Sequence, residues 1–288
     1  MQVTHLRDAA TFLARTAAFR ASEPVLSNVI STVTEGVVAG REYESVHWWI
    51  IEDSAPSRSD ALSQPQVLGV AMRTAPFNLV LSPMPQSAAQ ALSDSVREVF
   101  AQLPGVSAPK DVGEDFLSAY FASVAHVSVR MHDVIRVLDT FTPARGIPGA
   151  VRAVTEADRP LLHTWMRHFA EDAGVHAFGI DAAVVALLER GWLWQDAGQP
   201  VSVCGHTPVT GTVEARVVRV GPVFTPEEFR GHGYASAVTS HVISLLQPQA
   251  EILMLYADAN NPTSNGVYER LGMPVVDEIL EWELSYSD

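Results

Sequence analysis

The sequence has one cysteine, one lysine and no long apolar run, and each shortage excludes a class of protein. A single cysteine, Cys204, cannot form an internal disulfide. No uninterrupted apolar stretch reaches the roughly 18–20 residues that a membrane-spanning helix needs. The first residues carry charge and amphipathic spacing in place of the apolar core of a signal peptide. We therefore expect a cytoplasmic protein with no membrane partner.

Positive charge is also scarce. Lys110 is the only lysine, and the formal net charge of the 288-residue chain is −14. This excess argues against nucleic acid and anionic membranes as partners. It is compatible with a cationic amine substrate, although an ordinary solvated acidic surface gives the same balance. With 47% hydrophobic and 18% charged residues, the composition is typical of a globular protein long enough for two domains.

The one cysteine is a poor candidate nucleophile. Cys204 and His206 lie two residues apart on a predicted strand and would therefore share a face. A cysteine in such a run more often packs in the core as a small apolar side chain. We expect Cys204 to be inert.

The most informative stretch runs from Val217 to Ser236, VVRVGPVFTPEEFRGHGYAS. A strand expected over residues 211–225 breaks at Gly221-Pro222, and a glycine-rich turn then opens a helix. Before it, the pattern predicts a helix that starts after residues 155–158 and a hairpin over residues 192–207. Such a turn can hold phosphate, because several backbone N–H groups point into one concavity and the helix N-terminus adds positive partial charge. Arg230 adds a full positive charge at the edge of the turn.

Three kinds of phosphate site compete for this turn. A P-loop needs Lys followed by Ser or Thr, and this turn contains no lysine. A dinucleotide fingerprint would start at Gly231, but Ser236 replaces its third glycine, and Glu251 stands at the start of the next strand, not at its end. The third is the coenzyme A loop, Q/R-x-x-G-x-G/A, and residues 230–235, RGHGYA, satisfy every fixed position of it.

The chain therefore resembles the GNAT (GCN5-related N-acetyltransferase) superfamily, and the resemblance covers roughly its C-terminal half. A second motif supports it, because Asn261, Tyr268 and Gly272 follow in the order and spacing of the family's last helix. The resemblance implies acetyl-CoA as co-substrate and no metal. It implies a bulge at Gly221-Pro222 that separates the strand from its neighbour. The residues it implies as cofactor-binding are Val223, Thr225, Arg230, Gly231, His232, Gly233, Tyr234, Ala235, Ser236, Asn261 and Asn265.

The resemblance also implies Tyr268 as the catalytic general acid, since an ordinary phenol keeps its proton at neutral pH. Asn261 has a second interpretation as a helix cap. The general base stays open among Asp258, Glu214, Asp196 and a water chain. Some relatives carry a glutamate where Arg219 stands here, and Arg219 facing the cleft would instead pair with a substrate carboxylate.

The pattern of the first half predicts the order of helices and strands found in GNAT proteins, but without the glycine-rich phosphate turn. Helices are expected over residues 4–20 and 24–38, strands over 44–52, 66–74 and 77–82, and a helix begins after Ser82-Pro83-Met84-Pro85. Prolines remove backbone donors, so this turn cannot hold a pyrophosphate. We predict an α/β mixed-sheet protein with two GNAT-like halves: a degenerate domain at 1–140, a linker at 141–149, and an acetyltransferase domain at 150–288.

The function that follows is transfer of an acetyl group from acetyl-CoA to a primary amine of a small molecule or peptide. The alternative is a module that binds acyl-CoA, or another protein, without turnover. Neither the amine nor a choice between monomer and homodimer can be read from the sequence.

Overall fold

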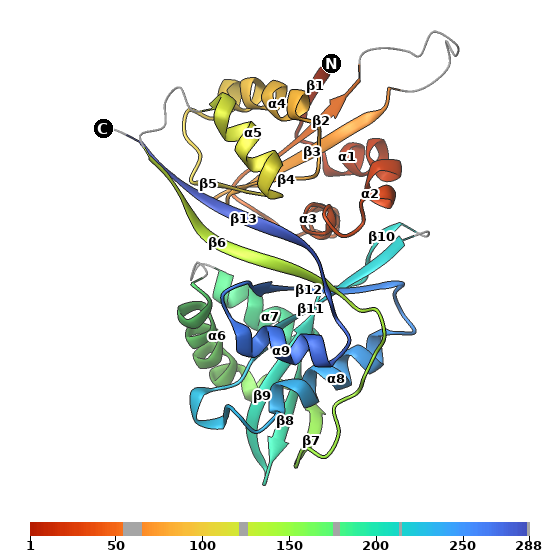
Figure 1. The fold of residues 1–288 in the computed structure, drawn as a ribbon, viewed down its shortest axis with the longest axis vertical. Coiled ribbons are helices and arrows are strands. Elements are labelled where there is room, and N and C mark those ends of the chain that lie inside the picture. Colours follow the sequence, from red (N-terminus) through yellow and green to blue (C-terminus); the bar gives the residue numbers. More distant parts are fainter. Residues whose placement is uncertain (54–64, 121–125, 175–178, 213–214, 287–288) are drawn as a thin grey trace. The chain divides into compact units, whose positions relative to one another are not determined.

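The structure is a computed structural model that describes residues 1–288 apart from 54–64, 121–125, 175–178, 213–214 and 287–288. Its internal contacts divide the chain into two compact units (Figure 1). Unit 1 comprises residues 1–133, 210–215 and 278–288, and unit 2 comprises 134–209 and 216–277. Unit 1 thus includes the C-terminal strand and residues 210–215, while the predicted domain boundaries at 140 and 150 stay a prediction.

Unit 1 contains a sheet with helices on both faces. Its elements are β1 (Gln2–Leu6), α1 (Ala9–Arg15), α2 (Ala17–Ser22), α3 (Asn28–Val38), β2 (Val46–Glu52), β3 (Val67–Thr74), β4 (Leu79–Leu81), α4 (Gln86–Val99), β5 (Gly105–Ala108), α5 (Lys110–Tyr120) and most of β6 (His126–Val137). The strand order is β1-β2-β3-β4-β5-β13, and β4 and β5 are parallel. The last of these, β13 (Val275–Ser285), comes from the C-terminal end of the chain.

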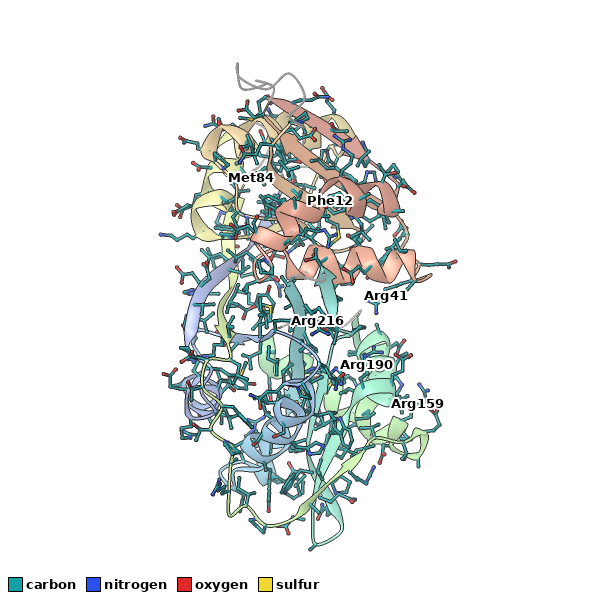
Figure 2. All side chains as sticks on the ribbon, turned by 90° about the vertical axis from the view of Figure 1, so that its right-hand side faces the viewer. Phe12, Arg41, Met84, Arg159, Arg190 and Arg216 are labelled. Atoms are coloured by element: carbon teal, nitrogen blue, oxygen red, sulfur yellow. The ribbon has the colours of Figure 1, made fainter. Side chains whose placement is uncertain are left out.

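Strand alternation places the two neighbouring tryptophans of β2 on opposite faces of this sheet. Trp49 packs with α4 and α5, whereas Trp48 packs with α1 and α3, where Phe12 is also fully buried (Figure 2). The Trp48 indole N–H donates to the Thr34 hydroxyl at 2.8 Å, so its polar atom is satisfied in the core.

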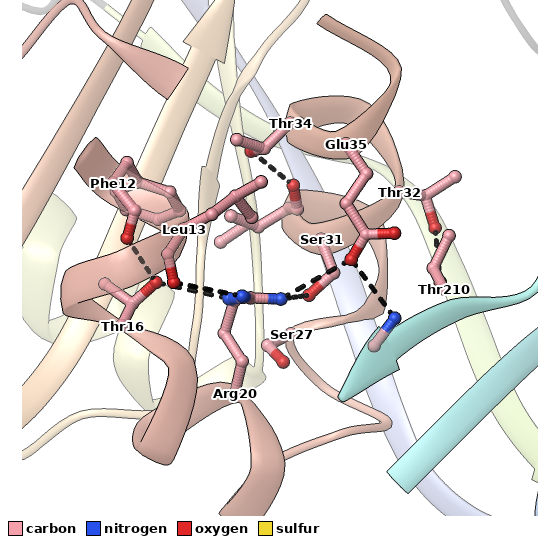
Figure 3. Close-up of polar contacts among 12 residues, drawn as sticks. Phe12, Leu13, Thr16, Arg20, Ser27, Ser31, Thr32, Thr34, Glu35 and Thr210 are labelled. Carbon is pink, nitrogen blue, oxygen red and sulfur yellow. Dashed lines mark hydrogen bonds and ion pairs between the residues drawn. The ribbon is translucent and has the colours of Figure 1, made fainter. Parts of the chain in front are cut away.

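A buried polar network fastens residues 210–211 to unit 1 (Figure 3). Arg20 donates to the Thr16 hydroxyl, to the Ser31 hydroxyl and to the Leu13 carbonyl, and it lies 3.6 Å from Glu35. Glu35 in turn accepts from the backbone N–H of Gly211 at 3.1 Å. Burial raises the pKa of the Glu35 carboxyl and lowers that of the Arg20 guanidinium. The short β10 (Thr210–Thr212) is thereby anchored by α3.

Unit 2 repeats this arrangement. Its elements are β7 (Ala150–Ala153), α6 (Arg159–Ala173), α7 (Ile180–Arg190), β8 (Trp192–Asp196), β9 (Gln199–His206), β11 (Ala215–Phe224), α8 (Tyr234–Leu246), β12 (Ile252–Asp258) and α9 (Pro262–Arg270). The strand order is β7-β8-β9-β11-β12-β6, and β11 and β12 are parallel. One core lies between the sheet and α8 and α9, and another lies against α6 and α7.

Two sequence-based predictions of elements were wrong. The chain begins with strand β1, where a helix was predicted from Thr4, because residues 2–6 pair with β2. The long strand predicted over 211–225 is two strands, β10 and β11, since β10 is held against α3. The predicted hairpin at residues 192–207 and the helices that begin near residues 159 and 234 are confirmed.

Candidate functional site

In unit 2, strands β11 and β12 separate to form a fork. They pair over Val217, Val218 and Arg219, opposite Ile252 to Met254, and the register found in the described residues ends there. Both strands continue, β11 to Phe224 and β12 to Asp258. Beyond Arg219 and Met254 the described residues of the two strands show no further register, so an extended ligand could lie between them there.

A bulge in β11 accompanies the fork. β11 pairs with β9 at Val220 and again at Val223, and the register shifts between them. The shift falls on Gly221-Pro222, where the sequence predicted it, because proline has no N–H for the ladder and Gly221 adopts a φ of +137°. Val223 pairs with Cys204 on β9, so its other edge faces the fork.

The glycine-rich turn ends where α8 begins. Gly231 and Gly233 have φ values of +82° and +83°, which residues with a Cβ rarely adopt, and Gly233 is the residue before the helix. No side chain caps this end of α8, and its first turn holds no acidic residue. Tyr234 is buried and Ala235 and Ser236 are half-buried, whereas residues 230–233 are exposed. The N-terminus of α8 thus keeps its positive partial charge open to an anion.

Arg230 lies beside this turn, and its role in binding a cofactor stays a prediction. Its Nε donates to the Thr225 carbonyl at 3.1 Å, and one terminal nitrogen pairs with the Asp172 carboxylate at 2.5 Å. Both side chains of the pair are about half exposed. His232 is exposed and stacks on Tyr234, with ring centroids 5.5 Å apart. Thr225 also uses its hydroxyl, which lies 2.8 Å from the Ser202 hydroxyl.

Tyr268 lies in the core between the sheet and α8 and α9, in one cluster with Val220 of β11 and with Leu255 and Ala257 of β12. Only 8% of it is exposed. Burial raises its pKa, as does the nearby Cys204 thiol, while Arg136 acts in the opposite direction. The phenol therefore keeps its proton at neutral pH.

Cys204 is fully buried in the same cluster, and burial raises the pKa of its thiol to about 12. A thiol that stays protonated is a poor nucleophile. The predicted packing of Cys204 in the core is confirmed, and its inertness stays a prediction.

The two predicted asparagines of α9 have partners within the protein. Asn261 caps the helix by accepting from the Ser264 N–H at 3.0 Å, as its second interpretation predicted. The Asn265 amide donates to the carbonyls of Asp258 and Asn261 and accepts from Arg136 Nε. Contact of either side chain with a cofactor stays a prediction.

Sequence reasoning missed Arg136. Its guanidinium is buried and donates to Asn265, to Glu269 at 2.7 Å and to the Met273 carbonyl at 2.6 Å. It thereby holds α9, and with it Tyr268, against β6. Residues 126–138 hold two arginines, Arg130 and Arg136, and no local signal distinguishes the one that becomes buried.

Comparison with known proteins agrees with this geometry. Residues 208–282 match the family model described as FR47-like protein. A GNAT-family acetyltransferase from Colwellia psychrerythraea is 10% identical with a TM-score of 0.59, covering 99% of this chain and 100% of that one. A tandem GNAT protein from the clavulanic acid biosynthesis pathway is 11% identical with a TM-score of 0.56, and the whole of both chains is covered. This chain has a tandem GNAT fold.

A Drosophila protein is 11% identical and similar in fold to this chain, with a TM-score of 0.64 and 98% coverage of each chain. A search of curated protein sequences finds no match. The FR47-like match lies on the GNAT half that carries both motifs, which supports the GNAT superfamily for this chain.

Within the GNAT fold, the general-base candidates differ in their surroundings. The Asp196 carboxylate accepts a 2.5 Å hydrogen bond from the Tyr234 hydroxyl, and Asp258 accepts from the Asn260 N–H. Glu214 lies outside the described residues. Arg219 lies at the base of the fork, with its guanidinium carbon 5.6 Å from the Tyr256 ring centroid.

The corresponding turn of the first GNAT half, between β4 and α4, runs through Ser82 and Pro85. The Ser82 hydroxyl accepts from the Val70 N–H, and the Pro85 carbonyl accepts from the N–H groups of Ala88 and Ala89. Among the described residues, no group of three or more His, Cys, Asp or Glu side chains is placed to hold a metal ion, and no helix is long and apolar enough to cross a membrane.

Proposed function

We propose that the protein is an N-acetyltransferase that uses acetyl-CoA and acts on a primary amine. The observation that carries the proposal is the fork between β11 and β12 beside the uncapped N-terminus of α8. The unpaired edge at Val223 suits the amides of an extended pantetheine arm, and the α8 terminus suits a diphosphate. Arg230 adds a positive charge at the same place.

The α8 end fits a diphosphate by its own chemistry. Gly231 and Gly233 keep side chains away from the backbone N–H groups, and a Cβ added at Gly231 would meet nothing within 4 Å. The pair with Asp172 must open or share Arg230 when an anion binds there. Because both partners are half exposed, that exchange costs little.

The reaction joins the amine nitrogen to the acetyl carbon as the carbon–sulfur bond breaks, and it yields an amide and a free thiol. The amine loses one proton and the sulfur gains one. In this proposal the Tyr268 hydroxyl supplies the proton to the sulfur, and Arg136 fixes the helix that carries it. Acetyl-CoA supplies the activated thioester.

The rival function is an acyl-CoA-binding module without turnover. A buried, protonated tyrosine at the fork favours catalysis, because a binder needs no acid there. The test is release of free thiol from acetyl-CoA with a panel of amines. Thiol release that depends on an amine supports the enzyme, whereas binding without release under every acceptor supports the module.

A further inference from the structure

Arg219 is the last residue of β11 that pairs with β12, so it stands at the base of the fork, opposite Met254. Its neighbours Val218 and Val220 pack into the core under α8. Side chains alternate along a strand, so Arg219 points to the other face of the sheet, the face that packs against α6 and α7. A thioester bound in the fork would present its acetyl group close to this position.

The position of Arg219 is fixed by its surroundings. Its N–H donates to the Thr207 hydroxyl at 3.0 Å, and its carbonyl accepts from the Thr207 N–H at 2.9 Å. The guanidinium lies over the ring of Tyr256, the next residue of β12 on the same face. Arg219 is half-buried, and this burial lowers the pKa of its guanidinium.

A second arginine belongs to the same region. Arg190, at the end of α7, directs its Nε to the His206 carbonyl at 3.4 Å, one residue before Thr207 (Figure 2). Burial is the main cause of the lowered pKa of His206, and the positive charge of Arg190 lowers it further. Arg190 also pairs with the Glu189 carboxylate at 2.6 Å, so Arg219 supplies the main positive charge beside residues 206–207. A dicationic acceptor such as a polyamine would be repelled here.

We infer that Arg219 selects amine acceptors that carry a carboxylate, the class to which free amino acids belong. The inference rests on the proposed function. A guanidinium pairs with a carboxylate through two parallel hydrogen bonds and orients it. The same positive charge disfavours the protonated form of the substrate amine, which lowers the pKa of that amine and yields the neutral nucleophile that transfer requires.

The test compares each amino acid with its own carboxamide, using the full chain, acetyl-CoA and thiol release. Alanine and alaninamide, leucine and leucinamide, and lysine and lysinamide are suitable pairs. The amide partners have less basic amines, so intrinsic reactivity at neutral pH favours the amides. We expect kcat/KM to favour the acids by about 10- to 100-fold, the range of a charge-assisted pair.

The substitution R219Q should bring the acid-to-amide ratio close to one, and R219K should retain part of the preference. The KM for acetyl-CoA should be unchanged in both. The matched control is R216Q, which removes the same charge from an exposed arginine of β11 that pairs with Glu251 (Figure 2). Its ratio should equal that of the wild type.

The outcomes separate the two proposals. Turnover of amides at least as fast as of acids, or a preference that survives in R219Q, overturns the role of Arg219 and leaves the transferase standing. If R219Q does not fold, the acid-to-amide ratios of kcat/KM for R219K and the wild type test the role of Arg219 instead. Bound acetyl-CoA with no thiol release from any pair overturns the transferase itself, and the selectivity with it.

Discussion

The hydroxyl of Tyr234, the first residue of α8, donates a 2.5 Å hydrogen bond to the carboxylate of Asp196 at the end of β8. This bond ties the β8–β9 hairpin to the glycine-rich turn, and His232 of the turn stacks on the same ring. The bond and the charge of Asp196 also raise the pKa of Tyr234. The pair therefore holds the turn in the conformation that exposes its N–H groups.

Tyr234→Phe should weaken coenzyme A binding several-fold and leave kcat nearly unchanged. The phenylalanine keeps the packing of the ring but removes the hydrogen bond to Asp196. The free turn is then less ordered, and ordering it on binding costs free energy that weakens the affinity. Calorimetric titration with coenzyme A and steady-state kinetics measure the two quantities. A fall in kcat at constant affinity would place Tyr234 in the chemistry instead.

Arg230→Gln and Asp172→Asn should change coenzyme A affinity in opposite directions. The first removes a positive charge beside the turn and should weaken binding about tenfold at low salt, with a shallower dependence on ionic strength. The second removes the carboxylate that pairs with Arg230 and should strengthen binding or leave it unchanged. Dissociation constants at two salt concentrations measure both. Weaker binding in Asp172→Asn would show that the pair is needed to position Arg230.

Tyr268→Phe should lower kcat by about 10²-fold or more, the range for loss of a general acid, with an unchanged dissociation constant for acetyl-CoA. The ring still fills its place in the core, so the stability should change little. Tyr43→Phe, at a partly exposed tyrosine of unit 1, is the matched control and should leave kcat alone. Equal turnover of Tyr268→Phe and wild type would refute the assignment.

Asp158→Asn should reduce stability more at neutral pH than in acid. Hydrogen bonds from Arg152, and then from Thr155, lower the pKa of Asp158 from 3.8 to about 2. A carboxyl whose pKa is lower in the folded than in the unfolded state stabilises the fold at pH values above its unfolded pKa. This contribution is lost as the pH falls toward the pKa of the folded state. The free energy of unfolding should therefore drop by about 1–2 kcal/mol at pH 7, less at pH 3.

Urea denaturation of Asp158→Asn at pH 7, 4 and 3 measures this effect. The control is Asp181→Asn, whose carboxylate is 93% exposed and lies 3.6 Å from His163. It should change the free energy of unfolding little at any of these pH values. A difference for Asp158→Asn that is constant with pH would mean that the ion pair is not its source.

The parts of the site that sequence reasoning found are those set by backbone chemistry. The glycines at 231 and 233 predict a positive φ, and Pro222 predicts a break in the strand ladder. Each prediction needs only the residue itself and its immediate neighbours. Asn261 predicted a helix cap in the same way, from its residue type at the start of a helical pattern. The phosphate turn, the bulge and the order of most elements follow from such residues.

What the sequence did not predict depends on partners far away in the chain. Arg136 reaches Asn265 and Glu269, more than a hundred residues on, and Asp196 meets Tyr234 through the packing of a hairpin on a helix. Strand β1 has helical spacing but pairs with β2. The place of β13 beside β5 has no local signal either, because either half could have used that strand.

The most direct test of the whole account is a calorimetric titration of the full chain with coenzyme A. The uncapped turn and the fork occur in unit 2, and the matching turn of unit 1 holds prolines, so the account predicts heat of binding with one molecule per chain. No heat, or two molecules per chain, would contradict it.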